Sequence, residues 1–410
     1  GQGGCVVVRG EAGIGKTRFA AECGQRAEAA GFRVHVCQVL DFGAEIGRDA
    51  VRTLVRQLVD LDLGVDAPAQ RVSAATRLAL ELDLAPPQIA ALNDLLDLPQ
   101  QGRAKASYAA LAPELRDETR RALVARIVQS RCASQPLMLI VEDVHWANAA
   151  ALRQFARLAA MAGEGAMLLM LTTRAEGDPL GQAWAADIGH ASVVAVELAP
   201  LAACDADRLA AEISQGDAAV MAGSLARAGG NPLFLEQLVL GAHAHGSRDL
   251  PGSLQSLIQA RIDALAPADR HAARAASVLG QSFNRAALQD MLDAPGYVCD
   301  RLADAYLVRR EGSSCRFAHA LIRDGVYASV PKRERTALHL RAAAWFEGRD
   351  AALWARHLGL GDAPTAALAY LTAARQEARQ YRFDAALSLA EQGLADRKST
   401  RLNSSHYRTS

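Results

Sequence analysis

A glycine-rich stretch close to the start of the chain has the composition of a phosphate-binding loop. Residues 10–17 read GEAGIGKT and match the pattern G-x-x-x-x-G-K-[ST]. In this pattern the backbone N–H groups of the turn surround phosphate, the lysine reaches the outer phosphates, and the hydroxyl ligates Mg²⁺. We therefore predict a magnesium ligand at Thr17 and nucleotide binding by Gly10, Glu11, Ala12, Gly13, Ile14, Gly15, Lys16, Thr17 and Arg18.

The residues on either side of this loop agree with that interpretation. The β-branched run Cys5–Val8 predicts a short buried strand, and a helical pattern begins at Arg18, directly after the loop. Strand, loop and helix is the order in which such loops occur. A glycine-rich surface turn is the alternative, and the context weighs against it.

Two acidic residues after another apolar run could hold the metal and activate water. Residues 137–141 are uninterrupted and apolar, as in a strand buried on both faces, and Glu142 and Asp143 come next. One acid is needed for nucleotide-bound Mg²⁺, and a second can orient or deprotonate the attacking water. By position we assign the metal to Glu142 and water activation to Asp143, but the roles could be reversed. Both are therefore candidate catalytic residues and magnesium ligands, and a solvated strand end is the alternative.

A further candidate lies at the end of the next apolar run. Thr172, Thr173 and Arg174 follow it, and a hydroxyl or guanidinium there can contact the outer phosphate and sense its presence. We include Arg174 among the nucleotide-binding residues, although a salt-bridged surface arginine would have the same sequence. His145 and Trp146 are expected to pack against the loop rather than to transfer protons.

The elements that must position these residues form an α/β core at residues 1–200. Further strands are expected at residues 33–39, 166–173 and 192–198, and a helical insertion occupies about residues 45–130. Alternation of this kind predicts a parallel, doubly wound sheet, in which the carboxyl ends of the strands meet at one edge.

The second half of the chain is predicted to be mostly helical. Residues 201–248 have a purely helical pattern, and residues 249–335 are expected to form a winged helix, because short helices there lead to two extended pieces around Gly312. Residues 336–395 are apolar and alanine-rich and begin a tetratricopeptide-like helical repeat region. Residues 396–410 depart abruptly from this pattern and resemble a translated sequencing adapter, with a polar tail as the alternative.

The composition gives no support for a general nucleic-acid or anionic-membrane surface. The 410 residues include 45 Lys and Arg and 45 Asp and Glu, so the formal net charge is zero. The seven cysteines are scattered and never spaced C-x-x-C, so neither a disulfide framework nor a zinc site is expected. The sequence has no signal peptide and no apolar run long enough to cross a bilayer, which favours a cytoplasmic location. The chain opens without methionine, and its helical pattern is broken off near residue 396, so we expect further sequence at both ends.

Six motifs, taken in order, resemble one family. GEAGIGKTR, LMLIVEDVHWAN, LLMLTTR, GGNPLFLEQL, LPGSLQSLIQARIDAL and FAHALIRDGVY, between about Gly4 and Tyr327, resemble the STAND-class signal-transduction ATPases. These relatives of the Orc-like AAA+ proteins occur in large LuxR-type transcriptional regulators and in nucleotide-cyclase fusions. The resemblance implies an α/β P-loop NTPase core followed by an all-α lid, a winged helix and a helical repeat sensor. It also implies that Pro232 packs on adenine, with a helix cap and turn as the alternative, while His319 is expected to be an ordinary core or surface histidine.

The resemblance implies a switch that binds ATP or ADP with Mg²⁺ and hydrolyses ATP slowly. It would regulate an attached output domain, either a transcriptional regulator or an adenylate or guanylate cyclase. The expected partners are an effector ligand or protein on the helical repeats and a second copy on ATP binding, with no membrane and no direct nucleic-acid contact.

Three other functions are alternatives to this switch. An Orc-like AAA+ ATPase acting on DNA would need a basic recognition helix, but the candidate at residues 297–306 carries Asp300 and Asp304 against Arg301 alone. A small-molecule kinase and a nucleotide-binding scaffold are the other two. The acidic helix and the zero net charge weigh against DNA.

Overall fold

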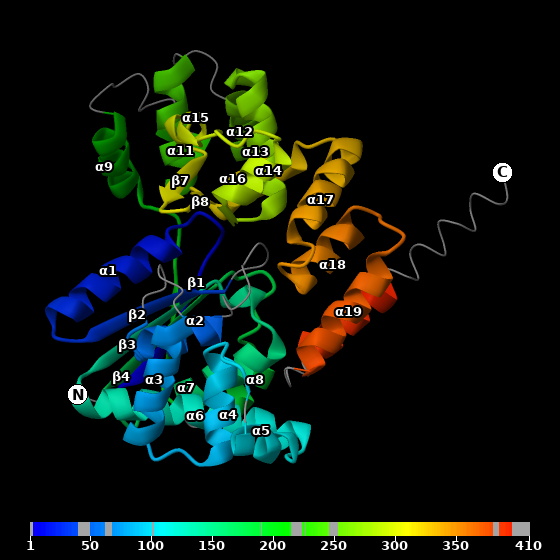
Figure 1. Cartoon of the computed structure of the whole chain (residues 1–410). Helices are drawn as coiled ribbons and strands as arrows, with labels where there is room; N and C mark the ends of the chain where they lie inside the picture. The colour runs from blue at the N-terminus through cyan, green and yellow to red at the C-terminus, as the bar shows by residue number, and fades with distance from the viewer. Residues whose placement is uncertain are drawn as a thin grey trace. The chain divides into compact units, whose positions relative to one another are not determined.

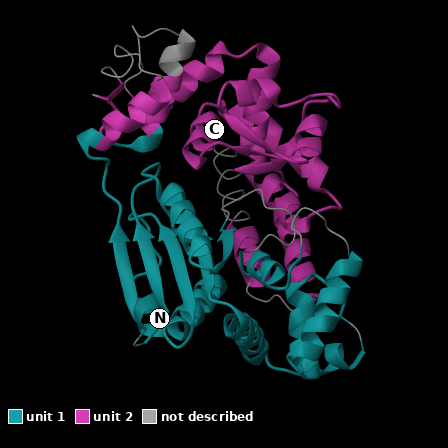
Figure 2. Cartoon of the chain, turned by 90° about the vertical axis from the view of Figure 1, so that its left-hand side faces the viewer, with its two compact units in different colours: residues 1–41, 46–204, 230–233 teal, residues 42–45, 205–229, 234–410 magenta. Residues whose placement is uncertain are grey.

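The computed structural model divides into two compact units (Figure 2). The first comprises residues 1–41, 46–204 and 230–233, and the second comprises residues 42–45, 205–229 and 234–410. No helix among the described residues is long and apolar enough to span a bilayer. The structure describes residues 3–39, 50–61, 68–100, 102–189, 191–214, 224–225, 227–245, 253–379 and 385–395.

A five-stranded parallel sheet forms the centre of the first unit (Figure 1). Its strands are β1 (Gly4–Arg9), β2 (Arg33–Gln38), β3 (Leu137–Glu142), β4 (Met167–Thr173) and β5 (Val193–Glu197). They lie in the order β2-β3-β4-β1-β5, and every neighbouring pair is parallel. All residues of β3 are buried, as its uninterrupted apolar sequence predicts. The predicted parallel α/β core is therefore confirmed.

The register of this sheet brings the ends of its strands to one edge. Gln38, the last residue of β2, pairs with Glu142 of β3, and Arg9 of β1 pairs with Thr173 of β4. The phosphate loop follows β1 and Asp143 follows β3, so both leave the sheet at this edge. Parallel strands separated by helices make this the usual place for a ligand.

Helices cover both faces of the sheet. Helix α1 (Lys16–Ala29) packs on one face, where Ala20 lies in a cluster with Val8 and Ile140. The residues that alternate with these, such as Val7 and Leu171, are equally buried on the other face, and α7 (Ala149–Ala162) packs there against β1 and β4. The short helix α8 (Gln182–Asp187) packs against α7.

The predicted helical insertion lies between β2 and β3. Its described part lies between residues 50 and 134, and the predicted range was about 45–130. Prolines occupy the first turns of α4 and α6, where a backbone N–H would have no partner within the helix. The helices are α2 (Ala50–Leu58), α3 (Pro68–Glu81), α4 (Pro86–Leu95), α5 (Gly102–Ala109) and α6 (Pro113–Ser134).

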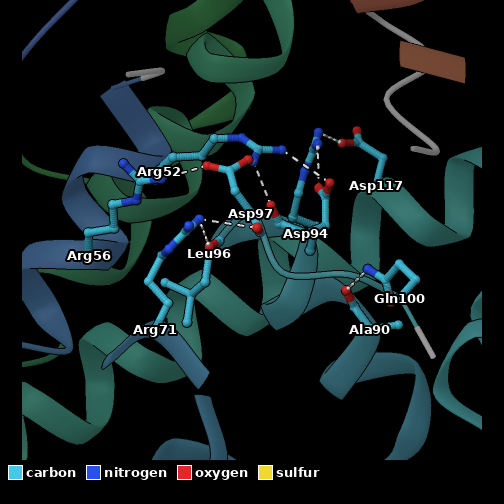
Figure 3. A network of polar contacts seen from close by, with 10 residues as sticks. Arg52, Arg56, Arg71, Ala90, Asp94, Leu96, Asp97, Gln100 and Asp117 are labelled. Atoms are coloured by element: carbon cyan, nitrogen blue, oxygen red, sulfur yellow. Dashed lines mark hydrogen bonds and ion pairs between the residues drawn. The ribbon is translucent and has the colours of Figure 1, made fainter. Parts of the chain in front are cut away.

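A buried network of charges holds the insertion together (Figure 3). Arg52 of α2 donates to the backbone carbonyl of Asp94 at 2.5 Å and pairs with the carboxylates of Asp94, at 3.1 Å, and Asp97. Arg56 pairs with Asp97 at 2.6 Å, and Arg71 of α3 donates to the carbonyl of Asp97 at 3.1 Å. The turn after α4 is thereby tied to both α2 and α3.

The second unit contains the predicted hairpin, and its assignment to a winged helix stays a prediction. Strands β7 and β8 form an antiparallel pair around Gly312, whose φ of 61° suits glycine in the turn, and β6 completes the sheet in the order β6-β8-β7. The elements of this part are α12 (Leu254–Ala264), α13 (Pro267–Leu279), β6 (Ser282–Asn284), α14 (Arg285–Met291), α15 (Asp300–Asp304), β7 (Val308–Glu311), β8 (Ser314–Phe317) and α16 (Ala320–Ala328).

The predicted recognition helix at residues 297–306 is shorter than expected, because α15 covers only Asp300–Asp304. Tyr297 is held ahead of the helix, where its hydroxyl donates to Asp269 at 2.9 Å and its carbonyl accepts from Gln289 at 2.9 Å. At the other end Tyr306 has a φ of 55°, which ends the helical backbone.

Helices make up the rest of the second unit. Before residue 253 the structure describes α9 (Ala203–Ser214), whose first two residues belong to the first unit, and α11 (Pro232–His245), which also begins there. After α16 come α17 (Lys332–Phe346), α18 (Ala351–Leu360) and α19 (Ala366–Arg379), which pack as successive neighbours. Residues 385–395 are helical too. The start of a repeat array stays a prediction, and residues 396–410 lie outside the described residues.

Two buried histidines connect α16, α17 and α18. The Nδ1 atoms of His339 and His357 lie 3.0 Å apart, and Nε2 of His339 lies 2.9 Å from the Tyr327 hydroxyl. Phe346 stacks on His357. Burial, together with the positive charges of three arginines, lowers the pKa of His339 to about 4, and burial lowers the pKa of His357 well below its usual value.

We expect the stability of the protein to fall as the pH is lowered from 7 to 5. The unfolded chain protonates His339 near its ordinary pKa of 6.5, whereas the folded chain does so only at about 4. The stabilisation from neutral His339 is thus fully present above about pH 6.5 and is lost progressively as the pH falls from there to about 4. At pH 5 the loss amounts to about 2 kcal/mol. Thermal unfolding at pH 7, 6 and 5 measures this loss.

A matched pair of variants isolates the histidine. His339→Gln keeps hydrogen-bonding groups but does not titrate, so it should reduce the pH dependence by about 2 kcal/mol between pH 7 and pH 5. His271→Gln, at an exposed position, should leave the dependence as it is. Equal pH dependence in the wild type and His339→Gln would contradict the prediction.

Candidate nucleotide-binding site

The loop between β1 and α1 has the backbone of an anion-binding turn. A Cβ atom at Gly10 would lie 2.8 Å from a methyl carbon of Ile14, and Gly13 and Gly15 have φ values of 82° and 104°, which favour glycine. Gly15 is the N-cap of α1, and no side chain caps this end or places an acid in its first turn. The first N–H groups of α1 are thus available to a negatively charged ligand.

Lys16 is buried within this loop. Its ammonium donates to the backbone carbonyls of Gly10 and Glu11, both at 2.8 Å. Burial lowers the pKa of Lys16; the charge of Arg174 lowers it further, while the Asp143 carboxylate opposes the shift. Lys16 therefore lies within electrostatic reach of the residues predicted at the ends of β3 and β4.

Thr17 and Glu142 come together as the sequence predicts for metal ligands. The Thr17 hydroxyl donates to Oε2 of Glu142 at 2.6 Å, although the residues are 125 positions apart in the chain. Glu142 is buried at the end of β3, whereas Thr17 is exposed in the first turn of α1. A hydroxyl and a carboxylate oxygen at this distance are oxygen donors of the kind that Mg²⁺ prefers.

Asp143 is held by contacts from both neighbouring strands. Its Oδ2 accepts from the side chain of Gln38 at 2.9 Å, and its backbone N–H donates to the Thr172 hydroxyl at 3.1 Å. Its φ of 58° turns the chain away from β3. The sequence analysis did not single out Gln38. Its position as a polar residue near the end of a predicted strand is the signal that could have found it.

Arg174 lies near the phosphate loop but makes its visible contact elsewhere. Its guanidinium lies 5.7 Å from the ring centroid of Trp146, which follows the two acids in a short 3₁₀ helix, η1 (Val144–Trp146). Thr172 and Thr173 are fully buried, and their hydroxyls bond to protein backbone. The contact of Arg174 with a nucleotide stays a prediction.

The turn that contains Pro232 contacts the phosphate loop directly. The Asn231 side chain donates to the carbonyl of Ala12 at 3.2 Å, and the Leu233 N–H donates to the carbonyl of Gly13 at 3.3 Å. Pro232 is the first residue of α11, which agrees with the helix-start alternative, and its contact with adenine stays a prediction. Asn231 was missed, because an asparagine before a proline is typical of many turns.

The remaining predicted residues take different positions. Ile14 is buried and supports the loop, whereas Glu11 and Arg18 are exposed, so Arg18 lies on the solvent side of α1. His319 is the N-cap of α16, where its Nδ1 accepts from the backbone N–H of Leu321 at 3.1 Å, in line with the expectation of an ordinary histidine.

The comparison with known proteins decides the family of this part of the chain. Residues 1–171 match the family model of the AAA ATPase domain. This segment is an AAA ATPase domain. Members of the family bind nucleotides, usually with Mg²⁺, and the uncapped helix, the buried lysine and the Thr17–Glu142 pair fit such a ligand.

Two known proteins match beyond the AAA ATPase domain. An uncharacterized protein of Rhizobium meliloti (strain 1021) is 25% identical over 382 residues, which are 86% of this chain and 36% of that protein. The Signal Transduction ATPase with Numerous Domains (STAND) protein with a tetratricopeptide repeat sensor from Pyrococcus horikoshii has a TM-score of 0.57 at 14% identity, over 96% of this chain and 56% of that one. The chain thus spans only part of both, and the second match shows a shared fold.

Replication proteins give a weaker match. The ORC2 protein of Aeropyrum pernix has a TM-score of 0.33 at 14% identity, over 85% of this chain and 90% of that one. This likeness is too low to carry an argument about the AAA ATPase domain or its function.

Proposed function

We propose that this chain is the ATP-binding switch module of a longer signal-transduction protein. The observation that carries the proposal is the Thr17–Glu142 contact of 2.6 Å at the uncapped N-terminus of α1, beside the buried Lys16. A helix N-terminus, a lysine and two oxygen donors together provide for the phosphates and the metal of a nucleotide.

Each site residue has a proposed role in this switch. Lys16 would exchange its two loop carbonyls for the outer phosphates, and Glu142 with Thr17 would hold Mg²⁺. Asp143, which is oriented by its contact with Gln38, would accept a proton from the attacking water. Bound Mg²⁺ would supply charge neutralisation of the phosphates.

The turn at residues 230–233 offers a route by which the site could influence the helical part. Asn231 and Leu233 bond to the phosphate loop, and Pro232 begins α11, which continues from the first unit into residues of the second. A change of loop conformation between ATP and ADP would therefore act on the start of this helix. We propose that Pro232 also contacts the adenine base.

The proposed output and partners lie largely outside the described residues. Slow hydrolysis would reset the switch, and the regulated domain would be a transcriptional regulator or a nucleotide cyclase. An effector would bind the helical repeats that begin near residue 336, and ATP would promote self-association. A cytoplasmic setting agrees with the seven free cysteines of the structure.

Action on DNA has less support than the switch. Arg301 pairs with Asp304 in α15, and Asp300 pairs with Arg310 of β7 at 2.7 Å, so the charges of this short helix compensate one another. A helix that enters the major groove instead presents cations and amides to phosphates and bases. A scaffold with a purely structural nucleotide would leave the Asp143–Gln38 contact without a role.

Replacing Lys16 with alanine tests the nucleotide assignment. We expect about 10- to 100-fold weaker binding of ATP, because charge-assisted hydrogen bonds to phosphate are lost. Lys105→Ala, at an exposed position of α5, is the control and should bind as the wild type does. Calorimetry measures both affinities; unchanged affinity in Lys16→Ala would refute the site, and fast turnover without any effector would favour a motor over a switch.

A further inference from the structure

Trp146 is placed to hold Arg174 beside the phosphate loop. The chain turns at Asp143 into η1, the Trp146 N–H donates to the Asp143 carbonyl at 3.0 Å, and the Asp143 N–H is tied to Thr172 of β4. The backbone that carries the indole is thereby held next to the strand end from which Arg174 extends. The Trp146 side chain is 42% exposed, so part of its indole surface is open to solvent.

The ion pairs of the described residues leave the Arg174 guanidinium aside. Among the residues that the structure describes, no carboxylate forms an ion pair with its guanidinium, which lies 5.7 Å from the Trp146 ring centroid. Asp178, an acid on the same loop, pairs instead with Arg9 at 2.7 Å. Arg174 follows Thr173, which pairs with Arg9 of β1, so it leaves the sheet at the same edge as the phosphate loop. Its charge also lowers the pKa of Lys16 in that loop.

We propose that Trp146 competes with the outer phosphate of ATP for the Arg174 guanidinium. The indole face is the resting place of Arg174 when the site is empty or holds ADP, and the arginine leaves it when ATP binds. A cation–π contact at an exposed position is weaker than a charge-assisted, bidentate contact with phosphate. Arg174 therefore moves to the phosphate when ATP binds, but the loss of the indole contact reduces the affinity for ATP. Trp146 is thus a positioning residue that biases the switch toward the state without an outer phosphate.

This role of Trp146 rests on the proposed function, and it predicts that loss of the indole strengthens the binding of ATP relative to ADP. Trp146→Ala removes the competitor, so it should raise the affinity for a non-hydrolysable ATP analogue relative to ADP by about two- to fivefold. The affinity for ADP should stay the same, because the contact is present both before and after ADP binds. Simple loosening of the site would instead weaken both nucleotides.

A double-mutant cycle and a matched control make the test specific. In an Arg174→Ala background, Trp146→Ala should no longer change the ratio of the two affinities. Trp345→Ala removes a similar contact, with Arg349 at 4.1 Å from the ring centroid, outside the AAA ATPase domain, and should leave the ratio unchanged. The tryptophan emission of the wild type should change with the ATP analogue but not with ADP, and Trp146→Phe should abolish most of that difference.

Separate outcomes overturn the inference and the proposed function. Normal binding of both nucleotides with an unchanged or lowered ratio in Trp146→Ala would overturn the role of Trp146 alone. Absence of nucleotide binding by the wild type would overturn the proposed function and the inference together. Thermal unfolding of each variant checks that the AAA ATPase domain is folded when the affinities are measured.

Discussion

Asp143→Asn is expected to lower the turnover of ATP by about 10²- to 10³-fold while leaving ATP binding intact, because asparagine cannot accept the proton of the attacking water. Asparagine should preserve the fold at this position. It tolerates the left-handed backbone, here with a φ of 58°, and its side-chain oxygen can still accept from Gln38. Single-turnover hydrolysis and calorimetric ATP binding measure the two effects separately.

A control and a second variant assign the roles of the two acids. Asp83→Asn is the control for Asp143→Asn, because Asp83 also has a left-handed backbone, with a φ of 44°, but is exposed between α3 and α4. Glu142→Gln should weaken Mg²⁺-dependent ATP binding, since it removes a charged oxygen beside Thr17. Normal turnover in Asp143→Asn combined with lost turnover but intact binding in Glu142→Gln would show that the two roles are reversed.

Arg52→Met is expected to lower the free energy of unfolding of the insertion by about 3 kcal/mol, because it leaves buried carboxylates without their main cation. Arg52 and Asp94 are each only 6% exposed, and Asp97 faces the same guanidinium (Figure 3). The remaining cations limit the loss, since Arg56 still pairs with Asp97 at 2.6 Å while Arg120 lies 3.9 Å from Asp94.

A surface pair provides the control for this prediction. Arg26→Met removes the Arg26–Glu22 pair of α1, in which the side chains are 79% and 42% exposed, and should change stability by less than about 0.5 kcal/mol. Urea unfolding followed by circular dichroism gives the free energies, and hydrogen exchange of residues 50–134 localises the effect. Similar values for the two variants would mean that the network contributes no more than a surface ion pair.

The sequence predicted much of the first unit because its signals are local. The phosphate loop needs glycines at positions with positive φ, and a strand buried on both faces needs an unbroken apolar run, as residues 137–141 provide. The parallel sheet followed from the alternation of such runs with helical stretches. Short elements were harder to predict: α15 is five residues long because Tyr297 and Tyr306 are fixed by contacts and backbone conformation that periodicity does not reveal.

The contacts between distant segments could not be read from the sequence. Gln38 and Asn231 are ordinary polar residues in their local sequences, and they gain their significance from Asp143 and from the phosphate loop, which lie far away in the chain. The same is true of Trp146, whose contact with the Arg174 guanidinium does not follow from its local sequence. Their partners are set by strand order and register, which a single sequence does not encode in any local pattern.

The sequence by itself determined which chemistry is present: a phosphate loop with Lys16 and Thr17, and two acids at the end of a buried strand. Residue type and spacing suffice for this, because the backbone of the loop and the charge of the acids are local properties. Only the tertiary structure decided which acid adjoins Thr17 and what restrains Asp143 and Arg174. The physical reason is that parallel strands meet through crossover helices, so residues separated by more than a hundred positions become neighbours only when the sheet has formed.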